Sequence, residues 1–284
     1  MPLAEKNSID LLHSAFDYLA DPQHGAPAPG YYWFRKRQKV LKLVAEHVRP
    51  SGETWKFVEL GCGNGIDLFL MRNQLGQLTG QERISFLGLE GNPTCVEMCQ
   101  AKADYYHADN VSFRTHNVLN PSSIDSASVD FVHCSEVLEH LPEPELLIAD
   151  AVRILKPGGQ FLVTTPNEPN VLQRSYWWPK HRSGQQLQNS VRVEVEGPDG
   201  KPLYLYDHIS LRKISEWEQT LAKYGLALEA AERGALCYSP HGLTDREFPF
   251  AVQLFIESVL DLLPVRMSRH ISDQLIGLYK KLPA

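Results

Sequence analysis

The sequence predicts an α/β fold in which helices flank a mostly parallel sheet. One observation is the helical apolar stripe over residues 144–155, which ends in Lys156-Pro157-Gly158-Gly159 and lies between two strand-like runs, as in a βαβ unit. The other is that short apolar runs follow one another with room for a helix between them. These runs are Phe57–Leu60, Ile84–Leu89, Val111–Arg114, Val129–Cys134 and Gln160–Thr165.

The segments on either side of these runs complete the predicted fold. Upstream, residues 8–20 and 33–48 have helical patterns, with a Pro/Gly-rich linker at 21–30, and we expect residues 1–50 to form an N-terminal helical cap. Downstream, the pattern predicts two helices and two further strands, which brings the sheet to seven strands. The helices are expected at 211–224 and 250–263, and the strands at 226–231 and 274–280.

Two insertions are expected in the main domain, which we place at residues 51–284. The first, at about 167–207, breaks the strand–helix rhythm and contains the turn sequence Gly197-Pro198-Asp199-Gly200, which is typical of a β-hairpin. The second, at about 236–270, is predicted to be helical. Long insertions after a strand often carry specificity, so we expect the first to act as a lid over a binding site.

Composition and charge exclude several classes of protein. The 284 residues are 43% hydrophobic and 22% charged, as in a large soluble domain, and the net charge of −6 argues against nucleic acid or an anionic membrane as a partner. No apolar run has 18 residues, and charged residues interrupt the N-terminus where a signal peptide needs an apolar core. The five cysteines contain no CxxC pair. We expect a cytoplasmic protein with free thiols, and the sequence leaves its oligomeric state open.

A glycine-rich turn is the strongest local signal in the chain. The sequence Val58-Glu59-Leu60-Gly61-Cys62-Gly63-Asn64-Gly65 falls between the first predicted strand and a helix. Alternating glycines let the backbone approach a ligand closely, and the helix N-terminus presents free N–H groups. A compact ligand is therefore expected here.

Glu90 follows the second predicted strand, ahead of Gly91. A carboxylate at this place can accept hydrogen bonds from both vicinal hydroxyls of a ribose, which predicts a ligand that contains a nucleoside. The glycine spacing GxGxG differs from the GxGxxG of dinucleotide-binding folds, so a dinucleotide-dependent oxidoreductase is disfavoured. That enzyme and a non-catalytic cofactor-binding scaffold remain as alternatives.

These motifs resemble those of class I S-adenosylmethionine-dependent methyltransferases of the small-molecule type. The resemblance covers about residues 55–167 and includes the runs Ser135–Leu141 and Ile154–Gly159. It implies a Rossmann-like sheet of seven strands, S-adenosylmethionine as the cofactor, and transfer of a methyl group to a small molecule. Residues 51–284 would then be the methyltransferase domain.

The resemblance also assigns parts of the cofactor to residues of this chain. Many relatives have Asp where this chain has Asn117, but Asn keeps a carbonyl that can accept a hydrogen bond from adenine N6. The implied contacts are Glu59, Ser135 and the backbone of Gly61 and Gly63 for the methionine end, Glu90 for the ribose, and Asn117 and the Val118 N–H for adenine, with Gly91 as a further cofactor-binding residue.

Two histidines are candidate bases for the reaction. Methyl transfer is an in-line displacement at a sulfonium, so the protein must align the reactants, exclude water and, for a hydroxyl acceptor, remove a proton. His140 follows the fourth predicted strand, and His208 lies further along the chain. A hydroxyl oxygen is therefore the favoured acceptor, with methylation at nitrogen or carbon as alternatives. A histidine that only shapes the loop is the other interpretation of His140.

A metal site is a further alternative. Glu136, Glu139 and His140 have i, i+3, i+4 spacing, which predicts a shared helical face, and together with His208 they resemble a divalent-metal site found in some methyltransferases. The same run occurs in relatives that need no metal, so a metal is not favoured.

Aromatic and basic residues before the glycine-rich turn and inside the first insertion are candidates for covering the ligands. We expect Arg37 to pair with the cofactor carboxylate and Tyr32 to cover the acceptor, whereas Lys36 and Lys39 are interpreted as solvated cations. Three successive aromatic residues of the insertion are expected to form the lid on the acceptor, namely Tyr176, Trp177 and Trp178.

Overall fold

The computed structural model describes residues 29–51, 54–79, 83–167, 193–196, 202–205, 209–234, 255, 258–272 and 274–283. Its centre is a seven-stranded sheet of order β3-β2-β1-β4-β5-β9-β8. The strands are β1 (Trp55–Leu60), β2 (Ile84–Glu90), β3 (Val111–Thr115), β4 (Val129–Ser135), β5 (Leu155–Pro166), β8 (Leu226–Arg233) and β9 (Gln274–Lys281).

The sheet is parallel except for β9, which runs antiparallel to both of its neighbours, β5 and β8. The predicted fold class is thus confirmed. The strand order reverses between β1 and β4, because β2 and β3 follow on one side of β1 while β4 and β5 follow on its other side. In open α/β sheets, ligands bind in the crevice at the carboxyl ends of the strands beside such a reversal.

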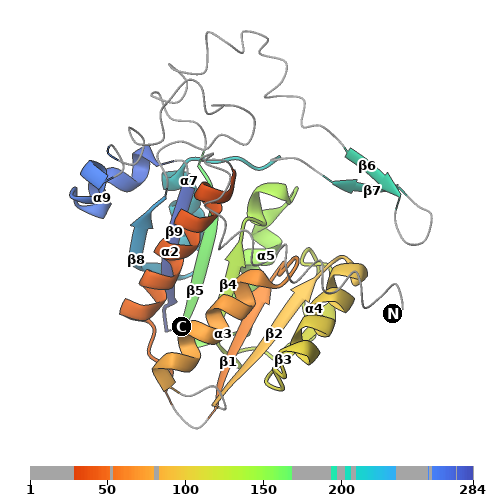
Figure 1. The fold of residues 1–284 in the computed structure, drawn as a ribbon. Helices are drawn as coiled ribbons and strands as arrows, with labels where there is room; N and C mark the ends of the chain where they lie inside the picture. The colour runs from red at the N-terminus through yellow and green to blue at the C-terminus, as the bar shows by residue number, and fades with distance from the viewer. Residues whose placement is uncertain are drawn as a thin grey trace.

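Helices cover both faces of the sheet (Figure 1). The buried residues of α2 (Pro29–His47), α3 (Ile66–Thr79) and α4 (Pro93–Tyr105) join one core cluster, and those of α5 (Pro144–Ile154) and α7 (Ile214–Lys223) join the other. The 3-10 helix η2 (Leu138–His140) follows β4, and α9 (Val265–Ser268) and η3 (Arg269–Ile271) precede β9. None of the helices in the described ranges has the length and apolar character that a membrane crossing requires.

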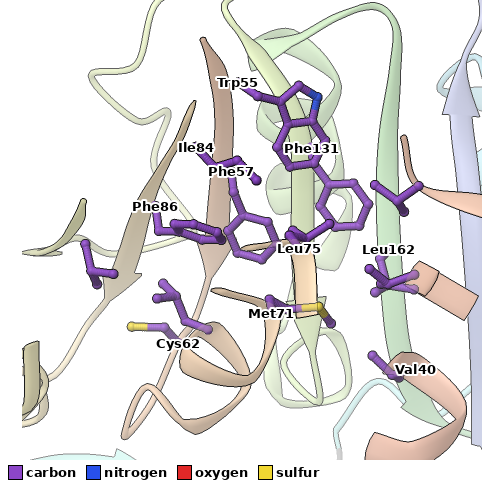
Figure 2. Packing of buried hydrophobic residues seen from close by; sticks show 14 of the residues in the cluster. Val40, Trp55, Phe57, Cys62, Met71, Leu75, Ile84, Phe86, Phe131 and Leu162 are labelled. Carbon is purple, nitrogen blue, oxygen red and sulfur yellow. The ribbon is translucent and has the colours of Figure 1, made fainter. Parts of the chain in front are cut away.

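Aromatic side chains from adjacent strands form the centre of the first core (Figure 2). Phe57 of β1 lies between Phe131 of β4 and Phe86 of β2, with ring centroids 5.4 Å and 5.2 Å away. All three rings are buried, and α2 closes the cluster with residues such as Leu43. Burying this much apolar surface holds the carboxyl ends of the central strands in fixed relative positions.

Several element boundaries differ from those predicted. The helix α2 begins at Pro29, inside the predicted linker, and α7 begins at Ile214 because Arg212 forms an isolated bridge with Asn167. The strand β5 begins at Leu155, ahead of the Pro-Gly-Gly turn, because Leu155 already pairs with Val129 and the register then shifts. The Pro-Gly-Gly sequence predicts a turn, but it does not reveal that the residues before it and the residues after it both pair with β4.

Parts of the two insertions are described. The predicted hairpin is confirmed, since β6 (Val193–Glu196) pairs antiparallel with β7 (Pro202–Leu205). Residues 258–261 are helical, within the predicted helix 250–263. The predicted helix 8–20 and most of both insertions lie outside the described residues.

The described cysteines are free thiols, as predicted. Cys62, Cys99 and Cys134 are buried and Cys95 is half-buried. Cys237 lies outside the described residues.

Candidate cofactor site

The predicted cofactor residues meet at one edge of the sheet. The strands β1, β2, β3 and β4 are parallel, so the segments that follow them lie at the same edge (Figure 1). The glycine-rich turn, residues 61–65, joins β1 to α3, while Glu90 ends β2 and Ser135 ends β4. This edge includes the reversal of strand order between β1 and β4.

The carboxylate of Glu90 joins the glycine-rich turn to the start of α4. Its Oε2 accepts from the Gly63 N–H and its Oε1 accepts from the Asn92 N–H, each at 2.9 Å. Asn92 in turn caps α4, because its side chain accepts from the Thr94 N–H at 2.9 Å. Each carboxylate oxygen can accept about two hydrogen bonds, so both oxygens retain the capacity to accept one from a ribose hydroxyl.

Two glycines of the turn have different surroundings. Both have positive φ, +74° at Gly61 and +52° at Gly63. A Cβ at Gly61 would lie 2.6 Å from a methyl carbon of Val137, whereas a Cβ at Gly63 would meet no atom within 4 Å. Gly61 is therefore required for packing, while Gly63 borders open space next to Glu90. This arrangement fits a nucleoside-containing ligand such as S-adenosylmethionine.

A group that we call the Asp67 cluster, formed by Lys36, Arg37, Asp67 and Ser135, connects α2 to this edge. Lys36 is 2% exposed, and its Nζ donates to Ser135 Oγ at 2.8 Å and lies 3.7 Å from Asp67 Oδ2. The Nε of Arg37 donates to Asp67 Oδ1 at 2.6 Å. The interpretation of Lys36 as a solvated cation was wrong, because α3 and β4 supply it with buried partners. Arg37 has Asp67 as a partner, and its pairing with the cofactor stays a prediction.

Lys39 is also buried, which contradicts its interpretation as a solvated cation. Its Nζ lies 3.0 Å from Asp261 Oδ1 and 3.4 Å from Glu232 Oε2. Arg233 of β8 binds the same oxygen of Asp261 at 2.9 Å. These ion pairs attach α2 to β8 and to the segment that contains residues 258–263.

Substituting Asp67 tests how much the Asp67 cluster stabilises the fold. Burial raises the pKa of this carboxyl, but the Lys36 and Arg37 cations outweigh that effect and hold the pKa below its usual range. We expect Asp67→Asn to lower the free energy of unfolding by about 2 kcal/mol, because Lys36 stays buried without its carboxylate. Urea unfolding measures this loss, and Asp109→Asn, at an exposed position, is the control. Equal stability of the two variants would contradict the assigned role.

The same carboxyl makes stability depend on acid pH. Its pKa is lower in the folded chain than the value of about 3.9 expected in the unfolded chain. The stabilisation is therefore complete above about pH 4 and is lost as the pH falls through the folded-state pKa. Asp67→Asn should remove this part of the acid dependence.

Glu59 forms a buried pair with a histidine that the sequence analysis did not single out. Glu59 Oε1 lies 2.9 Å from His133 Nδ1, on neighbouring positions of β1 and β4, and both side chains are at most 2% exposed. Burial raises the pKa of Glu59, and the hydrogen bond from His133 offsets part of that effect. A lone histidine in an apolar strand is a weak signal, and only the strand register reveals its partner. Contact of Glu59 with the methionine end stays a prediction.

Glu136, Glu139 and His140 do not share one helical face, which corrects the prediction from their spacing. Glu136 has a φ of +55° and precedes the 3-10 helix, so the run is not a continuous α-helix. The side chain of Glu136 accepts from Thr164 Oγ1 at 2.7 Å, whereas that of Glu139 accepts from Thr165 Oγ1 at 3.0 Å. In the described ranges, no group of three His, Cys, Asp or Glu side chains is arranged to hold a metal ion.

Glu139 and His140 differ in exposure although they are adjacent. Glu139 is 1% exposed, and burial together with the nearby Glu136 raises its pKa well above the usual range. The side chain of His140 is 41% exposed, and its Nε2 lies 3.7 Å from Glu139 Oε1. His140 is thus accessible beside the carboxyl end of β4, as a base acting on a bound acceptor must be.

The remaining predicted site residues have these positions. Gly91 is exposed after β2, and Asn117 is exposed after β3, where its Oδ1 accepts from the Leu119 N–H at 3.0 Å. Val118 is partly buried against the second core cluster. Tyr32 belongs to α2, but its side chain is outside the described part. His208 also lies outside the described residues, as do the predicted lid residues Tyr176, Trp177 and Trp178.

Comparison with known proteins shows which family this chain resembles. The profile of a family described as a methyltransferase domain matches residues 7–231. A probable S-adenosylmethionine-dependent methyltransferase of Mycolicibacterium smegmatis is 31% identical over 136 residues, which are 48% of this chain and 46% of that protein. A ubiquinone biosynthesis O-methyltransferase of Xanthomonas axonopodis pv. citri is 27% identical over 127 residues, 45% of this chain and 48% of the relative.

Among solved structures, the geranyl diphosphate C-methyltransferase of Streptomyces coelicolor A3(2) has the same fold. That structure contains Mg2+, geranyl diphosphate and S-adenosyl-L-homocysteine. It aligns with a TM-score of 0.54 at 15% identity, over 93% of this chain and 89% of the other. At this identity the match concerns the fold alone.

The strand order and the flanking helices give this chain the Rossmann-like fold of methyltransferases. The profile match then identifies the family: the chain belongs to the class I S-adenosylmethionine-dependent methyltransferases. It spans about half the length of the curated relatives that it matches.

Proposed function

We propose that this chain transfers the methyl group of S-adenosylmethionine to a small-molecule acceptor. The observation that carries the proposal is the position of Glu90, whose two oxygens hold the Gly63 and Asn92 N–H groups next to the open space at Gly63. When bound, the cofactor supplies an activated methyl group on a sulfonium. The protein orients it through the glycine-rich turn and Glu90, with Asn117, Val118 and Ser135 as further contacts.

A hydroxyl oxygen is the favoured acceptor atom, with His140 as the base. The support is the exposure of His140 at the edge of the sheet that carries the cofactor residues. With the cofactor bound, the neutral imidazole would take the hydroxyl proton as the acceptor oxygen displaces the sulfur from the methyl carbon, which would leave S-adenosylhomocysteine. The known proteins named above include both an O- and a C-methyltransferase, so methylation at carbon or nitrogen remains the alternative.

The insertion at about 167–207 is proposed to cover the acceptor. Thr165, just before it, and Ile209, just after it, both bond to Glu139, the residue that precedes His140. The insertion therefore leaves and rejoins the described chain beside the proposed base, and it contains Tyr176, Trp177 and Trp178. We propose a cytoplasmic enzyme without a nucleic-acid partner, consistent with the net charge of −6.

Ligand-dependent thermal stability distinguishes the proposed function from a dinucleotide-dependent enzyme. At about a hundredfold excess over its dissociation constant, S-adenosylhomocysteine should raise Tm by about 5 °C or more, because it binds only the folded protein. NAD should leave Tm unchanged. A shift with NAD and none with S-adenosylhomocysteine would support a dinucleotide enzyme and contradict the proposal. Mass spectrometry of candidate metabolites incubated with the enzyme then identifies the acceptor.

Replacing His140 tests the base. We expect His140→Ala to lower kcat about a hundredfold or more while the affinity for S-adenosylhomocysteine is retained, since proton removal contributes only to the chemical step. The control is His47→Ala, because the side chain of His47 is also 41% exposed but lies at the end of α2. A His140→Ala enzyme with unchanged kcat would exclude the histidine base and favour an acceptor that needs no deprotonation.

A further inference from the structure

We infer that Lys102 is a positioning residue for the cofactor, because its side chain holds the glycine-rich turn on the side that faces α4. The inference rests on the proposed function and extends it to a residue of α4. The Nζ of Lys102 donates to the carbonyl of Asn64 at 2.7 Å. One helical turn earlier, Cys99 Sγ lies 3.3 Å from the carbonyl of Gly63. Two successive carbonyls of the turn thus point at α4.

Holding these carbonyls fixes the orientation of two peptide planes. In a trans peptide the N–H points opposite to the C=O, and this structure contains no cis peptide in its described ranges. The Asn64 N–H therefore points away from α4, and the Gly65 N–H reaches the carbonyl of Cys62 at 2.8 Å. Glu90 holds the preceding N–H, that of Gly63. The backbone that faces the ligand is fixed by α4 on one side and Glu90 on the other.

Lys102 is buried to an extent that is unusual for a cation without a carboxylate partner. The residue is 4% exposed, and no ion pair joins it to a carboxylate in the described part of the chain. Burial lowers the pKa of its ammonium group. Its place in the last turn of α4 is favourable for a cation, because the carbonyl end of a helix carries partial negative charge.

A buried cation without a carboxylate is a poor way to stabilise a fold. An apolar side chain of similar length fills the same space without losing the hydration of a charge. Apart from its favourable place near the carbonyl end of α4, the structural benefit of Lys102 lies in its bond to the turn. Its removal should therefore weaken cofactor binding far more than it weakens the fold.

The test compares Lys102→Met with a matched lysine far from the site. Lys281 also donates to backbone carbonyls, those of Val152 and Leu155, each at 2.7 Å. Isothermal titration with S-adenosylhomocysteine should show about tenfold weaker binding for Lys102→Met and unchanged affinity for Lys281→Met. The Tm of Lys102→Met should stay within about 3 °C of the unaltered protein.

A second variant keeps the inference testable if Lys102→Met folds poorly. Lys102→Gln keeps a neutral N–H donor, and we expect its affinity to lie between those of Lys102→Met and the unaltered protein. Unaltered affinity in both variants, or a loss that follows falling Tm, would overturn the inference while leaving the proposed function intact. An equal loss in Lys281→Met would also overturn it. Failure of the unaltered protein to bind S-adenosylhomocysteine would overturn the proposed function itself, and this inference with it.

Discussion

Glu90→Ala is expected to weaken the binding of S-adenosylhomocysteine by about a hundredfold or more. The substitution removes two acceptors for ribose hydroxyls and releases the Gly63 N–H that Glu90 holds at 2.9 Å. Two hydrogen bonds to a charged group together contribute about 3 kcal/mol, which corresponds to about a hundredfold in affinity. Isothermal titration measures the effect directly.

The control for this variant is Glu97→Ala on α4. Glu97 is an exposed carboxylate close in sequence to Glu90, and its removal changes the net charge equally. We expect Glu97→Ala to bind S-adenosylhomocysteine as the unaltered protein does. If the two variants had the same affinity, Glu90 would not be the ribose contact.

Valine at Gly61 should mainly destabilise the fold, whereas valine at Gly63 should mainly prevent cofactor binding. In Gly61→Val the new side chain begins 2.6 Å from a methyl carbon of Val137 and the residue keeps a φ of +74°. We expect it to lower the free energy of unfolding by about 4 kcal/mol or more, because overpacking and left-handed strain act together. Urea unfolding measures this loss.

Gly63→Val should instead leave most of the stability and abolish cofactor binding. Its Cβ meets no protein atom within 4 Å, so the structural cost is mainly the strain of its φ of +52°, about 1–2 kcal/mol. The side chain then occupies the open space beside Glu90 where we place the ligand. A Gly63→Val protein that bound S-adenosylhomocysteine normally would show that the ligand lies elsewhere.

The parts of the site that are predictable from sequence are those built from neighbouring residues. The glycine-rich turn contains its signal within one strand–turn–helix segment, and Glu90 follows the next predicted strand. Because parallel strands end at the same edge of a sheet, the order of the elements is enough to bring these residues together. The comparisons confirmed the family that these motifs indicated.

The contacts of the charged residues were not predictable in this way. Lys36 was assigned to solvent because cations on an amphipathic helix usually face water, yet Ser135 and Asp67 surround it. The i, i+3, i+4 spacing of Glu136, Glu139 and His140 predicted a shared face, but the positive φ of Glu136 interrupts the helix. Local spacing gives a reliable geometry only where the backbone is regular.

The sequence by itself determined the α/β class and the edge of the sheet at which the glycine-rich turn and Glu90 meet, since both follow from local periodicity and from the order of the strands. Only the tertiary structure decided the partners of Lys36, His133 and Lys102, which lie 99, 74 and 38 positions away along the chain. Such partners are brought together by strand register and by the packing of helices on the sheet. The physical reason is that a buried polar group needs a hydrogen-bond or ion-pair partner, and the packing of the folded core decides which partner lies beside it. The distance along the sequence does not reveal that partner.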